Sequence, residues 1–301
     1  MIDRQGLKAI AEKYKDCLTV GYDLSKKCSY GTGGAADYYF APKTADALSS
    51  LVGDLKAEKA EYFILGGGSD VLVSDDGYRG AVISTENLAD LNLRGKILTA
   101  GAGVKIKDLV GYALLSSLGG LEFLSGIPAT VGGVTAMNAG CFGKSVSDRI
   151  CYAVTTDGVY PADECGFSYR DSRFKNSGEC LLEVAFRLDN CEYEQSESKI
   201  EYYKNLRRNK QPKGRSCGSV FLNDGYYAGK RIESCNLKGR RIGGARVSEK
   251  HANFIIADKG CTSGDVYALV REIKKVVLNE TGAELKEELI YLGNFDDENK
   301  F

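Results

Sequence analysis

The sequence predicts an α+β fold in which helices and strands are mixed rather than regularly alternating. Several segments carry apolar residues at helical spacing, and short runs rich in Val, Ile, Leu and Tyr between them indicate strands. The 301 residues are enough for about two domains with a substantial core. A hydrophobic share of 43 % and a charged share of 27 % exclude a disordered or fibrous chain.

In the first half of the chain, Thr44 is placed to cap a helix whose apolar stripe is Leu48, Leu51, Val52 and Leu55. The strands expected next are residues 62–65, which end abruptly at Gly66–Gly68, and then 71–73, 81–83 and 97–100. A second helix is predicted over 106–118, with Gly119 as its C-terminal stop.

Residues 150–156 and 181–188 read as further strands, and the polar, acidic stretch 190–197 predicts a boundary between a domain of residues 1–192 and one of residues 193–301. The second domain is expected to contain a helix over 200–208, extended residues 219–222 and an apolar run at 252–257. Its main helix begins at Thr262 or Ser263 and ends at Gly282, and a terminal strand follows at 289–292.

Cysteine and histidine usage excludes several kinds of site. The ten cysteines form no C-x-x-C pair and there is one histidine, so no zinc or iron–sulfur spacing is present and we expect no metal. The cysteines read as reduced, mostly buried thiols. His251 precedes an apolar run and reads as a structural residue, so proton transfer is expected from other residue types. The N-terminus has no signal-peptide core and no apolar run reaches membrane-spanning length, which favours a cytoplasmic protein.

Glycine and charge are both unevenly placed. Ten of the 36 glycines lie between positions 101 and 150, where backbone could approach a phosphate, although tight turns explain them equally well. The segment 201–250 holds 13 Lys/Arg against 4 Asp/Glu, a local charge of +9 in a chain of net charge -1. Such a segment fits a solvated face, a nucleic-acid site or a pocket for an anionic small molecule.

Several motifs together resemble the family of UDP-N-acetylenolpyruvoylglucosamine reductases over about residues 29–293. Residues 30–37 (Y-G-T-G-G-A-A-D) are similar to the family's R-I-G-G-P-A-D segment, and residues 66–72 (G-G-G-S-D-V-L) to its G-G-G-S-N-x-L loop, with Asp70 in place of asparagine. The run from Gly120 to Gly140, with G-I-P, V-G-G and M-N-A-G, continues the match.

The resemblance implies an FAD-binding fold of the vanillyl-alcohol-oxidase (PCMH) type over residues 1–192, built of two α+β subdomains with a core at about 29–190. A smaller α+β substrate-binding domain, with a catalytic C-terminal strand, would follow over 193–301. The length suggests the shorter, type II form of the family. The residues implied for FAD are Gly66, Gly67, Gly68, Ser69, Asp70, Gly126, Ile127, Pro128, Gly132, Gly133, Asn138, Ala139 and Gly140.

The resemblance also implies the reaction, in which NADPH reduces FAD and a hydride then passes from flavin N5 to C3 of the enolpyruvyl ether of UDP-N-acetylglucosamine. The Y-R-x-S-x-F motif assigns Arg170, which would stabilise the enolate that develops over the substrate carboxylate. The G-S-x-F motif assigns Ser219 as the proton donor to C2, and the terminal G-x-x-L-x-x-E pattern assigns Glu288 as a hydrogen-bond donor to the same carboxylate when protonated.

The product would be UDP-N-acetylmuramate, a peptidoglycan precursor. Asn223, Arg246 and Lys250 are implied in substrate binding, with the basic segment neutralising phosphates of substrate and NADPH. Leu222 replaces the family's common lysine, and Arg246 stands where glutamine or methionine is usual. We expect a monomer that binds neither nucleic acid nor membrane.

Two other functions remain open on the sequence. One is another flavoenzyme of the same FAD fold, such as an oxidase that uses oxygen. The other is an anion- or nucleic-acid-binding protein built around residues 201–250, whose binding would fall steeply with salt.

Overall fold

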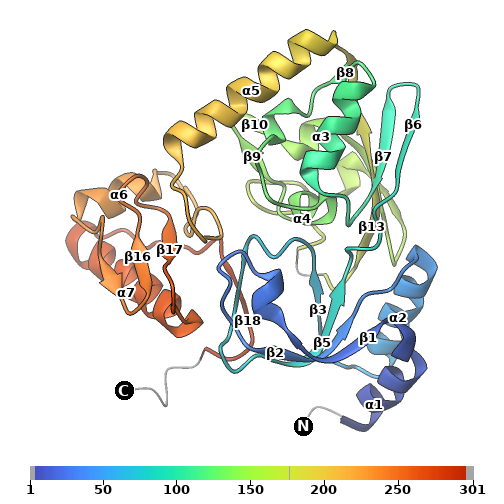
Figure 1. Cartoon of the computed structure of the whole chain (residues 1–301), viewed down its shortest axis with the longest axis horizontal. Coiled ribbons are helices and arrows are strands. Elements are labelled where there is room, and N and C mark those ends of the chain that lie inside the picture. Colours follow the sequence, from blue (N-terminus) through green and yellow to red (C-terminus); the bar gives the residue numbers. More distant parts are fainter. Residues whose placement is uncertain (1–3, 176, 296–301) are drawn as a thin grey trace. The chain divides into compact units, whose positions relative to one another are not determined.

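The computed structural model describes residues 4–175 and 177–295, and these form two compact units (Figure 1). Unit 1 contains residues 4–20, 38–67 and 80–207, whereas unit 2 contains residues 21–37, 68–79 and 208–295. Each unit therefore takes up several stretches of the chain. This division does not coincide with the boundary at residue 192, which remains a prediction about the domains. Among the described residues, no helix is long and apolar enough to cross a bilayer.

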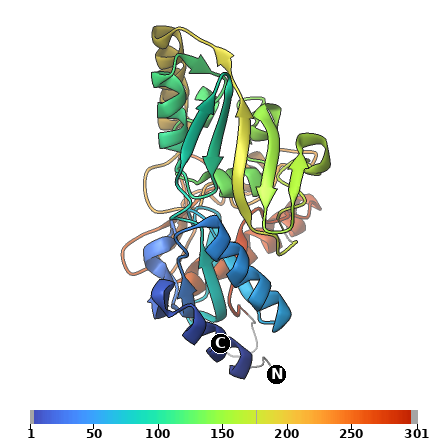
Figure 2. The same ribbon diagram turned by 90° about the vertical axis from the view of Figure 1, so that its right-hand side faces the viewer.

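Unit 1 is built on a five-stranded antiparallel sheet in the order β12-β11-β13-β7-β6, whose strands lie in a row in Figure 2. These strands are β6 (Leu91–Arg94), β7 (Ile97–Gly101), β11 (Ile150–Thr155), β12 (Val159–Pro161) and β13 (Leu181–Arg187). Short pairs are formed by β8 (Leu118–Gly119) with β14 (Asp189–Asn190) and by β9 (Gly140–Cys141) with β10 (Lys144–Ser145).

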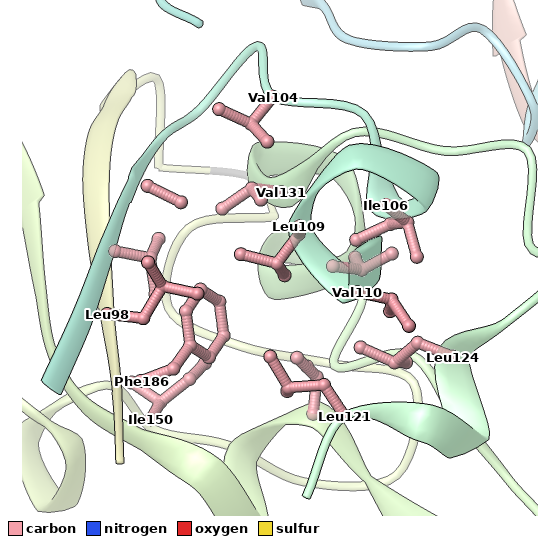
Figure 3. Packing of buried hydrophobic residues seen from close by; sticks show 14 of the residues in the cluster. Leu98, Val104, Ile106, Leu109, Val110, Leu121, Leu124, Val131, Ile150 and Phe186 are labelled. Atoms are coloured by element: carbon pink, nitrogen blue, oxygen red, sulfur yellow. The ribbon is translucent and has the colours of Figure 1, made fainter. Parts of the chain in front are cut away.

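The helices of unit 1 are α1 (Arg4–Lys13), α2 (Ala45–Ala57), α3 (Ile106–Leu115), α4 (Val131–Ala136) and most of α5 (Tyr193–Lys210). One core cluster joins α3 and α4 to the five-stranded sheet. Figure 3 shows Leu109 of α3 and Val131 of α4 gathered with Leu98 and Phe186 of the sheet, and all four are fully buried. This core holds α4 and the segments on either side of it, which together carry four of the seven glycines implied for FAD.

A second sheet has the order β1-β2-β5-β3, and its strands β1 (Leu18–Asp23), β2 (Ala35–Phe40) and β5 (Tyr78–Ser84) each run from one unit into the other. The remaining strand, β3 (Tyr62–Leu65), lies in unit 1 and pairs in parallel with β5. Helix α2 packs its predicted stripe into a separate core with Phe40 and Ile83. Thr44 caps this helix as expected, since its side chain accepts a hydrogen bond from the Ala47 N–H.

Unit 2 contains the antiparallel sheet β15-β16-β17, the parallel pair β4-β18, and helices α6 (Ala228–Ser234) and α7 (Ser263–Thr281). The strands are β4 (Val71–Val73), β15 (Arg241–Ile242), β16 (Ala245–Val247), β17 (Ile255–Ala257) and β18 (Ile290–Leu292). Helix α7 packs against β15 and β16 (Figure 1). Its ends are as predicted: Thr262 and Asp265 form a capping box, and Gly282 closes the helix with a φ of 68°.

Several sequence predictions need correction. Helix α3 ends at Leu115 rather than near 118, because Ser117 adopts a left-handed φ of 53°, and Gly119 lies in strand β8. Helix α5 starts at Tyr193, so most of the acidic stretch is helical. Residues 219–222 are predicted only to be extended, and Phe221 makes one isolated antiparallel bridge to Glu287 without forming a strand. The run at 252–257 contributes only Ile255–Ala257 as a strand.

We predict that Leu109→Ala lowers the free energy of unfolding by about 3 kcal/mol, because it leaves a cavity in the core of unit 1. The matched control is Leu115→Ala in the same helix. Leu109 is 0 % exposed and Leu115 is 79 % exposed, so the control should cost less than about 0.5 kcal/mol. Urea unfolding followed by circular dichroism measures both, and equal losses would contradict the burial seen for α3.

Candidate functional site

In unit 1, the two glycine-rich segments implied for FAD lie against each other. Gly66 and Gly67 directly follow strand β3. A Cβ added at Gly66 would lie 2.7 Å from Thr130 Oγ1, and one at Gly67 would lie 3.3 Å from the Ala129 Cα. A side chain at Gly66 would therefore displace the Thr130 hydroxyl, which accepts the Gly133 N–H as the cap of α4, so this close approach requires a glycine.

The segment that contains α4 also has a glycine at a position of close approach. A Cβ at Gly132 would lie 3.0 Å from the Ala102 Cβ. The N–H groups of Ile127, Gly132, Asn138 and Ala139 donate to protein carbonyl oxygens. Because these N–H groups already donate hydrogen bonds within the protein, they are not available to a ligand. Their residues would instead make room for a ligand beside the backbone.

The described residues fit an extended, oxygen-rich ligand such as FAD. At Gly66, Gly67 and Gly132 the backbone carries no side chain where it lies close to a neighbouring segment. Ser125 Oγ and Thr135 Oγ1 are buried and have no hydrogen-bond partner within the described chain, which leaves polar groups that a ligand or water would satisfy. We find no cluster of three or more His, Cys, Asp or Glu side chains suited to a metal among the described residues.

Arg170 lies at the tip of a tight turn in unit 1. Ser168 and Asp171 exchange backbone hydrogen bonds of 3.0 and 3.3 Å across Tyr169 and Arg170. Arg170 has a φ of 55°, a conformation in which glycine or asparagine is usual, and such strain is found most often at functional sites. Its Nη2 donates to the Gly140 carbonyl oxygen at 2.7 Å, which orients the guanidinium.

The Arg170 turn is bound to the end of the α4 loop by two further side chains. Asn138 is buried with a φ of 40°, and its Nδ2 donates to the Ser168 carbonyl oxygen at 2.7 Å. Ser172 Oγ donates to the Ala136 carbonyl oxygen at 2.7 Å. Asn138 was predicted to contact FAD. The structure shows it joining the segment implied for FAD to the segment that carries Arg170.

In unit 2, backbone hydrogen bonds bring the segments of Ser219 and Glu288 together. The Glu288 N–H donates to the Val220 carbonyl oxygen at 2.8 Å, and the Leu222 N–H donates to the Lys286 carbonyl oxygen at 2.9 Å. Ser219 and Glu288 are both half-buried. Two residues nearly 70 positions apart in sequence are therefore held on adjacent backbone segments, as joint action on one substrate would require.

The loop of Gly68, Ser69 and Asp70 also belongs to unit 2. Gly68 has a φ of 61°, and a Cβ there would overlap the Lys27 carbonyl oxygen. The Ile290 N–H donates to the Asp70 carbonyl oxygen at 2.8 Å, two residues after Glu288. This places the loop beside strand β18, which pairs with β4 from Val71 onward.

A pair of thiols holds the start of the Ser219 segment. Cys28 Sγ and Cys217 Sγ lie 2.8 and 3.4 Å from the same Val71 carbonyl oxygen, so the two thiols share one acceptor. The neighbouring Cys217 thiol lowers the pKa of Cys28, whereas burial raises the pKa of Cys217. All ten cysteines are free, and five are buried, including both members of this pair. No pattern in the sequence predicts the pairing, because the two cysteines are far apart along the chain.

The three predicted substrate-binding residues all have protein partners. Asn223 Oδ1 accepts the Ala228 N–H at 3.0 Å, at the start of α6. Arg246 Nε lies 3.0 and 3.2 Å from the two carboxylate oxygens of Asp258. Lys250 Nζ donates to the Arg208 carbonyl oxygen at 2.5 Å. Their role toward a substrate stays a prediction.

His251 lies in the turn before β17. Its ring packs edge-on against Phe254 with centroids 4.8 Å apart, and its Nδ1 accepts the Asn253 N–H at 3.3 Å. Burial lowers its pKa, which favours the neutral imidazole. These contacts agree with the structural role predicted for the one histidine.

Two families of known domains match the chain. An FAD binding domain matches residues 36–158, and the C-terminal domain of UDP-N-acetylenolpyruvoylglucosamine reductase matches residues 210–292. Together with the mixed helices and strands, these matches confirm the predicted fold class, an FAD-binding fold followed by a smaller C-terminal domain.

Relatives over nearly the whole chain carry one name. UDP-N-acetylenolpyruvoylglucosamine reductase of Caldanaerobacter subterraneus is 37 % identical over 94 % of this chain and 98 % of its own length. The enzyme of that name from Pelobacter propionicus is 39 % identical over 90 % of this chain and 94 % of its own. The crystal structure of the reductase from Thermus caldophilus superposes with a TM-score of 0.78 at 32 % identity, covering 91 % and 98 % of the two chains. The chain is thus a member of the UDP-N-acetylenolpyruvoylglucosamine reductase family and carries its FAD-binding domain.

Proposed function

We propose that this protein reduces the enolpyruvyl ether of UDP-N-acetylglucosamine to UDP-N-acetylmuramate, with FAD as cofactor and NADPH as reductant, as a step in peptidoglycan precursor synthesis in the cytoplasm. The observation that carries the proposal is family membership over at least 90 % of the chain. It is supported by the structures around the three residues assigned to the chemistry: the strained Arg170 turn and the backbone link between the Ser219 and Glu288 segments.

FAD would be held by the glycine loops at 66–70 and 126–140. When bound, it supplies the hydride, received from NADPH, that adds to C3 of the enolpyruvyl group. The carbanion left at C2 is delocalised over the adjacent carboxylate, which then needs positive charge and hydrogen bonds. Arg170 supplies the charge from a guanidinium oriented by Gly140. Glu288, in its protonated form, donates a hydrogen bond to the same carboxylate.

Ser219 delivers the proton that completes the reaction. Its Oγ–H gives a proton to C2, and the serine regains one from water. An alcohol is a weak acid, but the carbanion is a strong base, so correct placement of the hydroxyl matters more than its acidity. The backbone around Val220 supplies that placement, because both its N–H and its carbonyl oxygen are hydrogen-bonded.

The first test is direct. The purified protein should be yellow and release its flavin into the supernatant on acid precipitation, because FAD is held without a covalent bond. Anaerobic addition of the UDP-enolpyruvyl sugar to the NADPH-reduced protein should restore the oxidised flavin spectrum. Flavin that stays reduced until oxygen is admitted would instead indicate an oxidase.

We predict that Gly66→Ala lowers FAD occupancy of the purified protein at least about tenfold, since the added methyl would displace the Thr130 hydroxyl that caps α4. The ratio of flavin to protein absorbance measures occupancy. Gly53→Ala is the control, because it lies within α2 and a Cβ there meets nothing within 4 Å. It should keep full occupancy and gain up to about 1 kcal/mol of stability. Normal flavin content in Gly66→Ala would be evidence against these loops as the FAD site.

We predict that Ser219→Ala leaves flavin reduction by NADPH unchanged within about twofold and slows reoxidation by the enolpyruvyl substrate about 10³-fold, as expected for loss of a general acid. Stopped-flow flavin absorbance under anaerobic conditions separates the two half-reactions. Ser234 is an exposed serine of the same unit, and Ser234→Ala should show the same rates as the unsubstituted protein in both half-reactions. An equal slowing of both half-reactions in Ser219→Ala would rule out the proton-donor role.

We predict that Arg170→Lys slows reoxidation about 10²-fold, because lysine cannot present a planar guanidinium to the carboxylate. Arg173→Lys is the matched control three residues along the same segment. Arg173 pairs with Glu179 at 3.2 Å and lies over the Tyr160 ring, so this change should alter turnover less than about twofold. Comparable losses in the two variants would assign Arg170 to the fold rather than to the reaction.

A further inference from the structure

Asn253 makes three hydrogen bonds to the two residues that follow Ser219. Its Oδ1 accepts the Phe221 N–H at 3.0 Å, its Nδ2 donates to the Phe221 carbonyl oxygen at 2.8 Å, and its own carbonyl oxygen accepts the Val220 N–H at 2.9 Å. Asn253 is only 2 % exposed, and Phe221 only 1 %. A single buried residue therefore satisfies most of the backbone polar groups of this segment.

Asn253 is itself firmly held. It lies between His251 and strand β17, and its N–H donates to His251 Nδ1. The neighbouring Phe254 is fixed on both sides, since its N–H donates to the His251 carbonyl oxygen at 3.0 Å and its carbonyl oxygen accepts the Ser248 N–H at 2.8 Å. The anchor for the Ser219 segment is thus part of the unit 2 core.

The Ser219 segment has little regular support of its own. It forms no strand, and its backbone hydrogen bonds with the segment of Glu288 amount to one isolated bridge, between Phe221 and Glu287. The carboxamide of Asn253 pairs with the N–H and C=O of a single residue, as the backbone of a neighbouring strand would. Only Asn or Gln carries a donor and an acceptor in this arrangement, and the buried Phe221 groups would otherwise lack these bonds at a cost of about 1–3 kcal/mol each.

We propose that Asn253 is the positioning residue for the protonation step: its side chain fixes the peptide of Phe221, and through Val220 it sets where Ser219 stands relative to Glu288. This inference rests on the proposed role of Ser219. Asn253 has no part in flavin reduction, so its loss should affect one half-reaction and leave the other intact.

Asn253→Asp is the sharpest variant, because it keeps the size and the acceptor while the ionised form loses the donor to Phe221. A buried carboxyl has a raised pKa, so lowering the pH from 8 toward 5.5 should protonate the aspartic acid, restore the donor and recover the rate. We expect reoxidation by the enolpyruvyl substrate to be slowed at least about tenfold at pH 8 and less than about threefold at pH 5.5, relative to unchanged protein at the same pH. Flavin reduction by NADPH should stay within about twofold throughout.

The control is Ser263→Ala, which removes another buried hydrogen bond of unit 2, the 2.8 Å bond from Ser263 Oγ to Thr32 Oγ1. It should lower stability to a similar degree without separating the half-reactions and without pH-dependent recovery. The proposal is overturned if the Asn253→Asp variant behaves like this control. It is also overturned if the variant slows both half-reactions equally.

A second measurement needs neither FAD nor substrate. In Asn253→Asp at pH 8, amide hydrogen exchange at Val220 and Phe221 should be at least about tenfold faster, while exchange in α7 stays unchanged. Unaltered exchange at 220–221 overturns the proposal. Ser219→Ala, run in parallel, separates the two ideas: if it reoxidises normally, the role of Ser219 fails, whereas the exchange result still decides whether Asn253 holds the segment.

Discussion

The peptide unit of Val220 is the point on which the arrangement in unit 2 depends. Its N–H is bound by Asn253 and its carbonyl oxygen accepts the Glu288 N–H. These two bonds fix the Ser219 segment between the core around β17 and the residues leading into β18. Together with the bond from the Leu222 N–H to the Lys286 carbonyl oxygen, they keep Ser219 on a backbone segment adjacent to that of Glu288. The proposed reaction therefore depends on these backbone hydrogen bonds, because they position the two side chains that act on the substrate.

In unit 1 the constraint is steric, because some positions leave no room for a Cβ atom. Its glycines stand where two loops approach each other too closely for a Cβ, as at Gly66 beside Thr130. Several amides of the α4 loop are already donors within the protein. The glycine pattern of this family member is thus explained first by loop packing, and the room for FAD is a consequence of backbone that carries no side chains.

Local signals explain which parts of the fold could be predicted from sequence. Thr44 and the Thr262–Asp265 capping box mark helix starts within a few residues, and the structure confirms them. Helix α4 was missed because Val131–Ala136 is short and contains two glycines, which disfavour a helix. The sequence predicts that residues 219–222 are extended, but it does not predict that Phe221 pairs with the side chain of Asn253, 32 positions away. No periodicity along the chain encodes such a contact.

The basic segment, residues 201–250, shows that a count of charged residues does not by itself locate an anion-binding site. Arg246 and Arg241 both pair with the Asp258 carboxylate, and Arg215 donates to the Asp258 carbonyl oxygen. Arg240 pairs with Glu272. The local charge of +9 therefore overstates the positive potential that a diphosphate would meet, because the Asp258 and Glu272 carboxylates offset two of these nine charges. Arg170, by contrast, lies outside that segment and is held in an unfavourable backbone conformation. We therefore base the proposed contact with the substrate carboxylate on Arg170, whose guanidinium is oriented by the Gly140 carbonyl oxygen, and not on the density of lysine and arginine along the chain.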